Sequence, residues 1–123
     1  MKKTIKIYED SYKDLPSRFS QKIHHDLNFI LSKDIPGLTK IYLFGSCARN
    51  EVRSTSDVDL LIVTKEKLQD RMLASEIRWT LDEPILGIHT DVVYQNETSE
   101  SSPSVFQTVV DRDKKLILEV EDD

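Results

Sequence analysis

Four residues in the middle of the chain have the types and spacing of a site for phosphate chemistry. Gly45 and Ser46 follow one apolar run, and Asp57 and Asp59 stand at the start of the next. Successive side chains of a strand point to opposite faces, so two aspartates two residues apart share one face. Two carboxylates this close repel each other unless a cation lies between them. The pair therefore predicts a divalent metal site with Asp57 and Asp59 as ligands.

A third carboxylate completes the predicted metal site. Asp91 lies between apolar residues of a later strand-like run. Oxygen-only ligands favour magnesium or manganese over zinc. Three carboxylates can hold two metal ions about 4 Å apart, which stabilises the entering and leaving oxygens of a phosphoryl displacement. Asp91 is also the candidate to accept the proton of an attacking hydroxyl group.

The Gly45-Ser46 turn supplies the predicted nucleotide-binding half. Gly45 lets the backbone approach a ligand closely, and the Ser46 hydroxyl and the following amides can grip the outer phosphates. Ser46 is predicted to cap a short helix that runs to about Glu51. Cations for a triphosphate are available around this stretch at Lys40, Arg49 and Arg53.

Hydrophobic periodicity predicts the elements that position these residues. Helices are predicted at 16–33, 65–82 and 104–112, and strands at 40–44, 58–64, 88–94 and, as a last strand or an extended tail, 115–120. Residues 1–14 are predicted to form an N-terminal arm or edge strand, 95–104 a loop and 121–123 a frayed tail. The pattern predicts one domain over 1–123, of α/β (α+β) class, with a small mixed sheet of three to five strands and helices mainly on one face.

Within the predicted helices, the apolar residues indicate which faces are buried. The helix at 65–82 is expected to turn Leu68, Met72, Ile77 and Leu81 inward, with Trp79 in the core or at its rim. His24 and His25 lie between the apolar positions of the helix at 16–33 and have no partner at metal-ligand spacing. We expect them to be solvated or half-buried.

Bulk properties exclude several classes of protein. The chain has 123 residues, 38% hydrophobic and 32% charged, and no apolar run approaches the ~20 residues that a membrane-spanning helix needs. The N-terminus lacks the apolar stretch of a signal peptide, so a cytoplasmic protein is expected. The net charge of −5 disfavours a long nucleic acid as partner. Cys47 is the single cysteine, and we interpret it as a small filler rather than a catalytic thiol.

Taken in order, these motifs resemble a known signature. FGSCARN followed by STSDVDLLIV is similar to the G-S-X-A-R-G and S-D-X-D-L motifs of the DNA polymerase β-like nucleotidyltransferase superfamily. Within it, the short chain resembles the minimal nucleotidyltransferases that are paired with HEPN-domain toxins. Asn50 stands where the motif has glycine, and because asparagine tolerates a left-handed backbone, the turn is expected to survive.

This resemblance implies a nucleotidyltransferase fold and assigns roles to the candidate residues. Gly45 and Ser46 would bind the phosphates of ATP, and Arg49 would contact a phosphate or brace the loop. Asp57 and Asp59 would bind magnesium, with Asp91 as the third catalytic carboxylate. The acceptor implied is a tyrosine hydroxyl of a HEPN-type toxin, which would make the chain an antitoxin that modifies its target.

Two other functions stay open at the level of sequence. The chain could neutralise a partner by occlusion, without catalysis. Alternatively, it could be a stand-alone nucleotidyltransferase for small molecules that works as a homodimer and binds the acceptor between subunits. A templated polymerase is disfavoured by the length and acidity of the chain.

Overall fold

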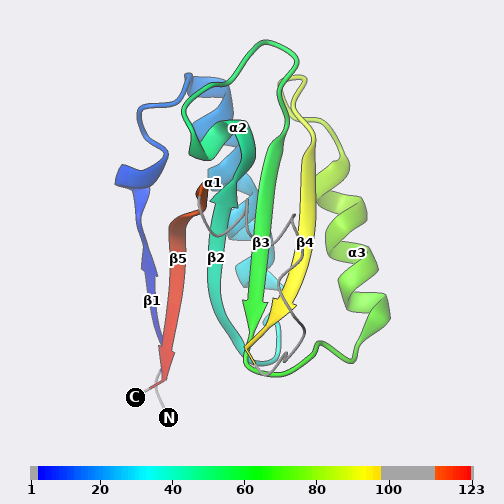
Figure 1. The fold of residues 1–123 in the computed structure, drawn as a ribbon. Helices are drawn as coiled ribbons and strands as arrows, with labels where there is room; N and C mark the ends of the chain where they lie inside the picture. Colours follow the sequence, from blue (N-terminus) through cyan, green and yellow to red (C-terminus); the bar gives the residue numbers. More distant parts are fainter. Residues whose placement is uncertain (1–2, 98–112, 123) are drawn as a thin grey trace.

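Five strands form one mixed sheet in the computed structural model, which describes residues 3–97 and 113–122 (Figure 1). The strand order is β1-β5-β2-β3-β4. The elements are β1 (Lys3–Ile7), a 3₁₀ turn (Glu9–Ser11), α1 (Ser17–Ser32), β2 (Leu38–Phe44), α2 (Gly45–Ala48), β3 (Val58–Thr64), α3 (Arg71–Asp82), β4 (Thr90–Asn96) and β5 (Lys115–Asp122). The predicted fold class is confirmed.

The direction of the three strands β2, β3 and β4 determines where the site can form. β2 is antiparallel to β3, and β3 is parallel to β4, with α3 as the connection between them. The end of β2 and the starts of β3 and β4 therefore lie side by side where these strands end or begin. We call this end of the sheet, at the top of Figure 1, the upper edge. The candidate residues Gly45, Asp59 and Asp91 all lie at this edge.

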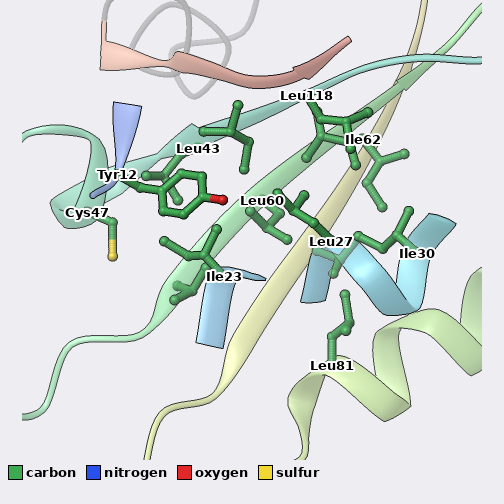
Figure 2. Packing of buried hydrophobic residues seen from close by; sticks show 14 of the residues in the cluster. Tyr12, Ile23, Leu27, Ile30, Leu43, Cys47, Leu60, Ile62, Leu81 and Leu118 are labelled. Carbon is green, nitrogen blue, oxygen red and sulfur yellow. The ribbon is translucent and has the colours of Figure 1, made fainter. Parts of the chain in front are cut away.

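The main core lies between the sheet and its helices. α1 contributes Ile23, Leu27 and Ile30, which are fully buried among side chains of the central strands and Leu81 of α3 (Figure 2). These apolar residues of α1 recur three or four positions apart, so they form one face of the helix. The opposite face of the sheet carries a second, smaller buried cluster of Phe44, Leu61 and Val63.

The start of α3 and the placement of two of its apolar side chains were predicted wrongly. The helix begins at Arg71 rather than near residue 65, because the Asp70 carboxylate caps it by accepting a hydrogen bond from the Leu73 amide at 3.0 Å. With this start, Ile77 and Leu81 face the core. Met72 is 85% exposed and Trp79 is 77% exposed, so neither packs in the core.

The two terminal strands pair with each other at the edge of the sheet. β1 is one of the two edge strands of the sheet, and its residue Lys3 pairs with Asp122. The prediction of a frayed tail is therefore wrong for residues 121 and 122, whose main chain is held by the pairing with β1. The helix predicted at 104–112 lies outside the described residues, as does most of the loop predicted at 95–104, while Gln95 and Asn96 belong to β4. In the part of the chain that is described, no helix has the length and apolar character needed to cross a bilayer.

Candidate active site

Gly45 and Asp59 face each other across the β2–β3 pair. Phe44, the last residue of β2, pairs with Asp59, and Gly45 follows with a φ of 72°. A Cβ atom added to Gly45 would overlap the Asp59 carboxylate. Glycine is therefore required twice, for its left-handed backbone and for the space that it leaves to this carboxylate.

Two of the three predicted carboxylates lie on one face of the sheet, and the third lies in the loop directly before β3. Asp59 and Asp91 are register partners on the parallel strands β3 and β4, so their side chains point to the same face. Asp57 precedes Asp59 by two residues and is exposed, directly before β3 begins. The strand pairing thus places Asp59 and Asp91 side by side, although they are 32 residues apart in the sequence.

Electrostatic repulsion is concentrated on Asp59. Burial, followed by the charges of Asp91 and Asp57, raises the pKa of Asp59 to about 6, although the Arg49 charge lowers it. A carboxylate in this environment is stabilised in its charged form by a nearby cation. The half-buried Asp59 is therefore the residue of the three that a bound cation would affect most.

The donor set fits a hard divalent cation in its chemistry. Asp57, Asp59 and Asp91 offer only carboxylate oxygens, the ligands that magnesium prefers. Among residues 3–97 and 113–122, however, no three His, Cys, Asp or Glu side chains are close enough together to hold a metal ion jointly. Mutual repulsion is expected to keep carboxylates apart when no cation links them. The structure thus brings the three predicted ligands to one end of the sheet, but their carboxylates do not surround a common metal position.

The turn after β2 differs from the prediction in its capping. α2 covers only Gly45–Ala48, and its N-cap position is Phe44, so Ser46 lies inside the helix and does not cap it. The helix also ends before Glu51, because Arg49 and Asn50 close it with main-chain bonds to Gly45 and Cys47. Within the described residues no bond from the Ser46 hydroxyl to a protein group is found, so this half-buried group is available to a ligand.

Asn50 and Arg49 shape the exit from α2. Asn50 has a φ of 56°, which confirms that asparagine takes the left-handed conformation where the related motif has glycine. The Arg49 guanidinium donates to Glu51 and to Asp113, each at 3.2 Å. Asp113 lies two residues before the start of β5, so Arg49 connects the candidate site to a distant part of the chain. These contacts hold the turn after α2 against the residues that lead into β5.

Gly45→Ala is expected to impair both folding and chemistry. The left-handed backbone alone costs about 1 to 2 kcal/mol for a residue with a Cβ, and the added methyl group must also displace the Asp59 carboxylate. Gly37→Ala is the matched control, because Gly37 has the same φ of 72° but a Cβ there would meet Lys65 only at ordinary contact distance. Chemical denaturation should show a larger loss for Gly45→Ala than for Gly37→Ala, and equal losses would contradict the steric argument.

Cys47 is buried beneath the turn and is chemically quiet. Its side chain is 1% exposed, and burial, followed by the charges of Asp59 and Asp57, raises the pKa of Cys47 to about 12. Because the thiolate is the reactive form, we expect iodoacetamide at pH 8 to leave Cys47 unmodified in the folded protein and to alkylate it in urea. Rapid alkylation of the folded protein, followed by mass spectrometry, would contradict this and reopen the catalytic-thiol alternative.

A buried charged network beneath Asp91 was missed by the sequence analysis. Lys22 and Asp26 of α1 are both fully buried, and the Lys22 ammonium donates to Asp26 at 2.7 Å and to the Leu81 carbonyl at 2.9 Å. Thr90 donates to the second oxygen of Asp26 at 2.5 Å. Burial raises the pKa of Asp26, against the hydrogen bonds from Lys22 and Thr90. The network thus joins α1 to the end of α3 and to the residue before Asp91.

Arg18 was also missed, and it connects the two turns that precede the carboxylates. Its guanidinium donates to the Leu86 carbonyl at 3.1 Å and to the Ser54 carbonyl at 2.9 Å. Ser54 lies in the turn before Asp57, and Leu86 lies in the turn before β4. The burial of Lys22 and Asp26 could have been predicted, because both fall on the apolar face of α1. No sequence pattern predicts the contacts of Arg18.

Comparison with known proteins identifies relatives of this fold. The model of the nucleotidyltransferase domain family matches residues 27–118, well over half of the chain. No significant match was found among curated protein sequences.

Solved structures give a consistent result. A toxin-antitoxin structure with AMP-PNP is 25% identical, with a TM-score of 0.53 over 75% of this chain and 69% of that one. Two mutants of the toxin-antitoxin MntA-HpeT, 24% and 23% identical, have TM-scores of 0.55 and 0.52. They cover 76% and 75% of this chain and 70% and 69% of theirs, and at this identity they show a shared fold.

Proposed function

This chain belongs to the nucleotidyltransferase domain family, and from this we propose that it transfers AMP from ATP to a hydroxyl group of a partner protein. The observation that carries the proposal is the edge of the sheet where Gly45 adjoins Asp59 and where Asp59 and Asp91 are register partners. The similarity to a toxin-antitoxin structure with AMP-PNP supports an adenine nucleotide as the donor.

Asp57, Asp59 and Asp91 are the residues that would hold magnesium, as two ions. When bound, the metal neutralises phosphate charge and stabilises the entering and leaving oxygens of the displacement. The carboxylates themselves fix the position of that positive charge. The raised pKa of Asp59, caused by burial and by the charges of Asp91 and Asp57, supports this proposal.

The remaining residues bind, orient and move a proton. The main chain at Gly45 and the free hydroxyl of Ser46 would orient the outer phosphates, with Arg49 bracing the turn that carries them. The acceptor oxygen attacks the α-phosphorus, the bond from that phosphorus to the bridging oxygen breaks, and pyrophosphate leaves with the bonding electrons. Asp91, exposed at the edge strand β4, would take the proton of the hydroxyl group.

The partner proposed is a HEPN-type toxin, with a tyrosine hydroxyl as the acceptor. Two findings support it, the motif resemblance and the likeness to toxin-antitoxin structures. In this proposal the protein acts in the cytoplasm as an antitoxin, and modification of the tyrosine inactivates the toxin.

Label transfer tests the proposal directly. The protein is incubated with magnesium, ATP labelled in the α-phosphate and the product of the adjacent gene, in parallel with an Asp57→Ala/Asp59→Ala variant. Label is expected on the partner with the wild type and absent with the variant. Tandem mass spectrometry should locate the added AMP on a tyrosine.

Two outcomes would support the alternatives instead. If no label transfers while the double variant still neutralises the partner, the proposal fails and neutralisation occurs by occlusion. If label appears on a small molecule and never on the partner, the stand-alone enzyme is correct. Asp10→Ala, which removes an exposed carboxylate from the 3₁₀ turn, is the matched control and should transfer label as the wild type does.

A further inference from the structure

The outer face of α3 carries an exposed apolar surface that the fold does not explain. Met72 and Trp79 are seven residues apart, so they lie on the same side of the helix, about 10 Å from each other along its axis. Their exposed fractions of 85% and 77% are the highest among the large apolar residues described. Ser75 lies between them on the same face and is also exposed.

Two adjoining hollows extend this surface to the candidate site. One has a volume of about 680 Å³ and is lined in part by Met72, Ser75 and Trp79. The other has about 580 Å³ and is lined in part by Ser75, Trp79 and Asp91. Both hollows are lined by Ser75 and Trp79, so they adjoin each other. We call the two together the α3 groove, which extends from Met72 along α3 to Asp91 of β4.

The residue types of the α3 groove are those of a protein interface. Tryptophan, methionine and arginine are enriched where proteins bind each other, and the groove contains Met72, Trp79, Arg71 and Arg78. Arg78 lies over the ring of Tyr94 at 5.3 Å, so its guanidinium is already held in place. An exposed apolar patch bordered by polar residues marks an interaction site.

The shape of the groove favours a protein segment over a small molecule. Sites for small molecules enclose most of the ligand surface, whereas this groove follows the solvent-facing side of a helix for two turns. A small acceptor bound beside Asp91 would leave the part near Met72 unused. An extended or helical segment would cover both ends.

We propose that the α3 groove is the docking surface for the acceptor protein, which lays an apolar segment against Met72 and Trp79 and so brings its hydroxyl group to Asp91. The role of Asp91 rests on the proposed function, but the docking itself does not. The groove would then select the acceptor, while the carboxylates of the sheet edge perform the chemistry.

Binding measurements test the groove separately from catalysis. The product of the adjacent gene is titrated by calorimetry into an Asp57→Ala/Asp59→Ala protein, which cannot transfer label, with and without the added changes Met72→Ala and Trp79→Ala. Loss of these two side chains is expected to weaken binding about 30-fold, the effect of removing one interface hot spot. Ile5→Ala/Ile7→Ala, on the strand β1 at the opposite edge of the sheet, is the matched control and should bind with unchanged affinity.

A second variant and two further readouts make the result decisive. Ser75→Arg, which fills the middle of the groove, should weaken binding in the same way, and the melting temperature of each variant should equal that of its parent because all three side chains are exposed. In an otherwise wild-type protein, the groove variants should raise the KM for the partner and leave the affinity for ATP unchanged.

The outcomes distinguish the two proposals. If the groove variants lose binding but the wild type transfers no label, docking is correct and the proposed enzyme activity is wrong. Unchanged affinity in both groove variants, or no binding of the partner by the wild type, would overturn the docking proposal. It is also overturned if the variants only convert a homodimer into monomers, since the occupant would then be a second copy of this chain.

Discussion

Asp59→Asn is expected to lower the rate of AMP transfer by about 100- to 1,000-fold, the usual cost of removing one preorganised electrostatic contact from an active site. Asparagine keeps the shape of the side chain beside Gly45 but removes its charge, so the loss isolates the electrostatic contribution of this carboxylate. Initial rates with labelled ATP and saturating magnesium measure the effect. Asp34→Asn is the matched control, because Asp34 is 92% exposed and lies outside the candidate site.

The same substitution is expected to stabilise the metal-free protein above pH 6. The folded protein holds the pKa of Asp59 at about 6, above its ordinary value of 3.8. The folded state therefore binds more protons than the unfolded state between these pH values, so its stability falls as the pH rises through this window. Asparagine does not titrate and removes that loss, which we expect to be about 1 kcal/mol because the carboxylate is only partly shielded from water.

Urea unfolding at pH 4 and pH 7.5, without magnesium, measures this stability difference. The wild type should lose more stability between the two pH values than Asp59→Asn. If Asp59→Asn is both as active as the wild type and no more stable at pH 7.5, Asp59 has no functional charge, and the proposed site is wrong.

Breaking the buried pair of Lys22 and Asp26 is expected to have the largest effect on stability. Both side chains are fully buried, so Lys22→Met leaves an unpaired carboxylate in the core and Asp26→Leu leaves an unpaired ammonium group. Removing one partner of such a pair costs about 3 to 5 kcal/mol of unfolding free energy. The double variant removes both charges and should lie closer to the wild type than either single variant.

A pair on the surface provides the comparison. Lys13 and Asp10 are 3.0 Å apart but exposed, so Lys13→Met should cost less than about 1 kcal/mol. Urea unfolding followed by circular dichroism measures all four variants. If Lys22→Met costs no more than Lys13→Met, the buried pair does not hold α1 against α3 and β4.

Much of the sheet was predictable because its strands are short apolar runs with clear ends. β3 was predicted with its observed bounds, since polar turns enclose a run of residues buried on both faces. The start of α3 was not predicted, because the charged residues before Asp70 suit a helix as well as a loop. The Asp70 cap determines where the helix begins. The inward placement of Met72 failed with it, because Met72 and Ile77 are five residues apart and do not share a helix face.

The site was predictable only where strand geometry determines it. The period of two predicts that Asp57 and Asp59 share one face, although β3 begins only at Val58. The parallel pairing of β3 with β4 brings Asp91 beside Asp59. The contacts of Lys22 and Arg18 connect residues that are far apart in the chain, and a helical pattern gives no information about such partners. The metal-binding role of the three aspartates and the nucleotide-binding role of Gly45 and Ser46 stay predictions.

The place of β5 in the sheet has a consequence for synthesis of the protein. Among the described strands β5 comes last in the sequence, yet it lies between β1 and β2. A ribosome-bound chain that still lacks β5 exposes the unpaired edge of β2 and leaves β1 without its partner. Pairings this distant in sequence slow folding, so we expect the complete sheet to form only after the last strand has left the ribosome.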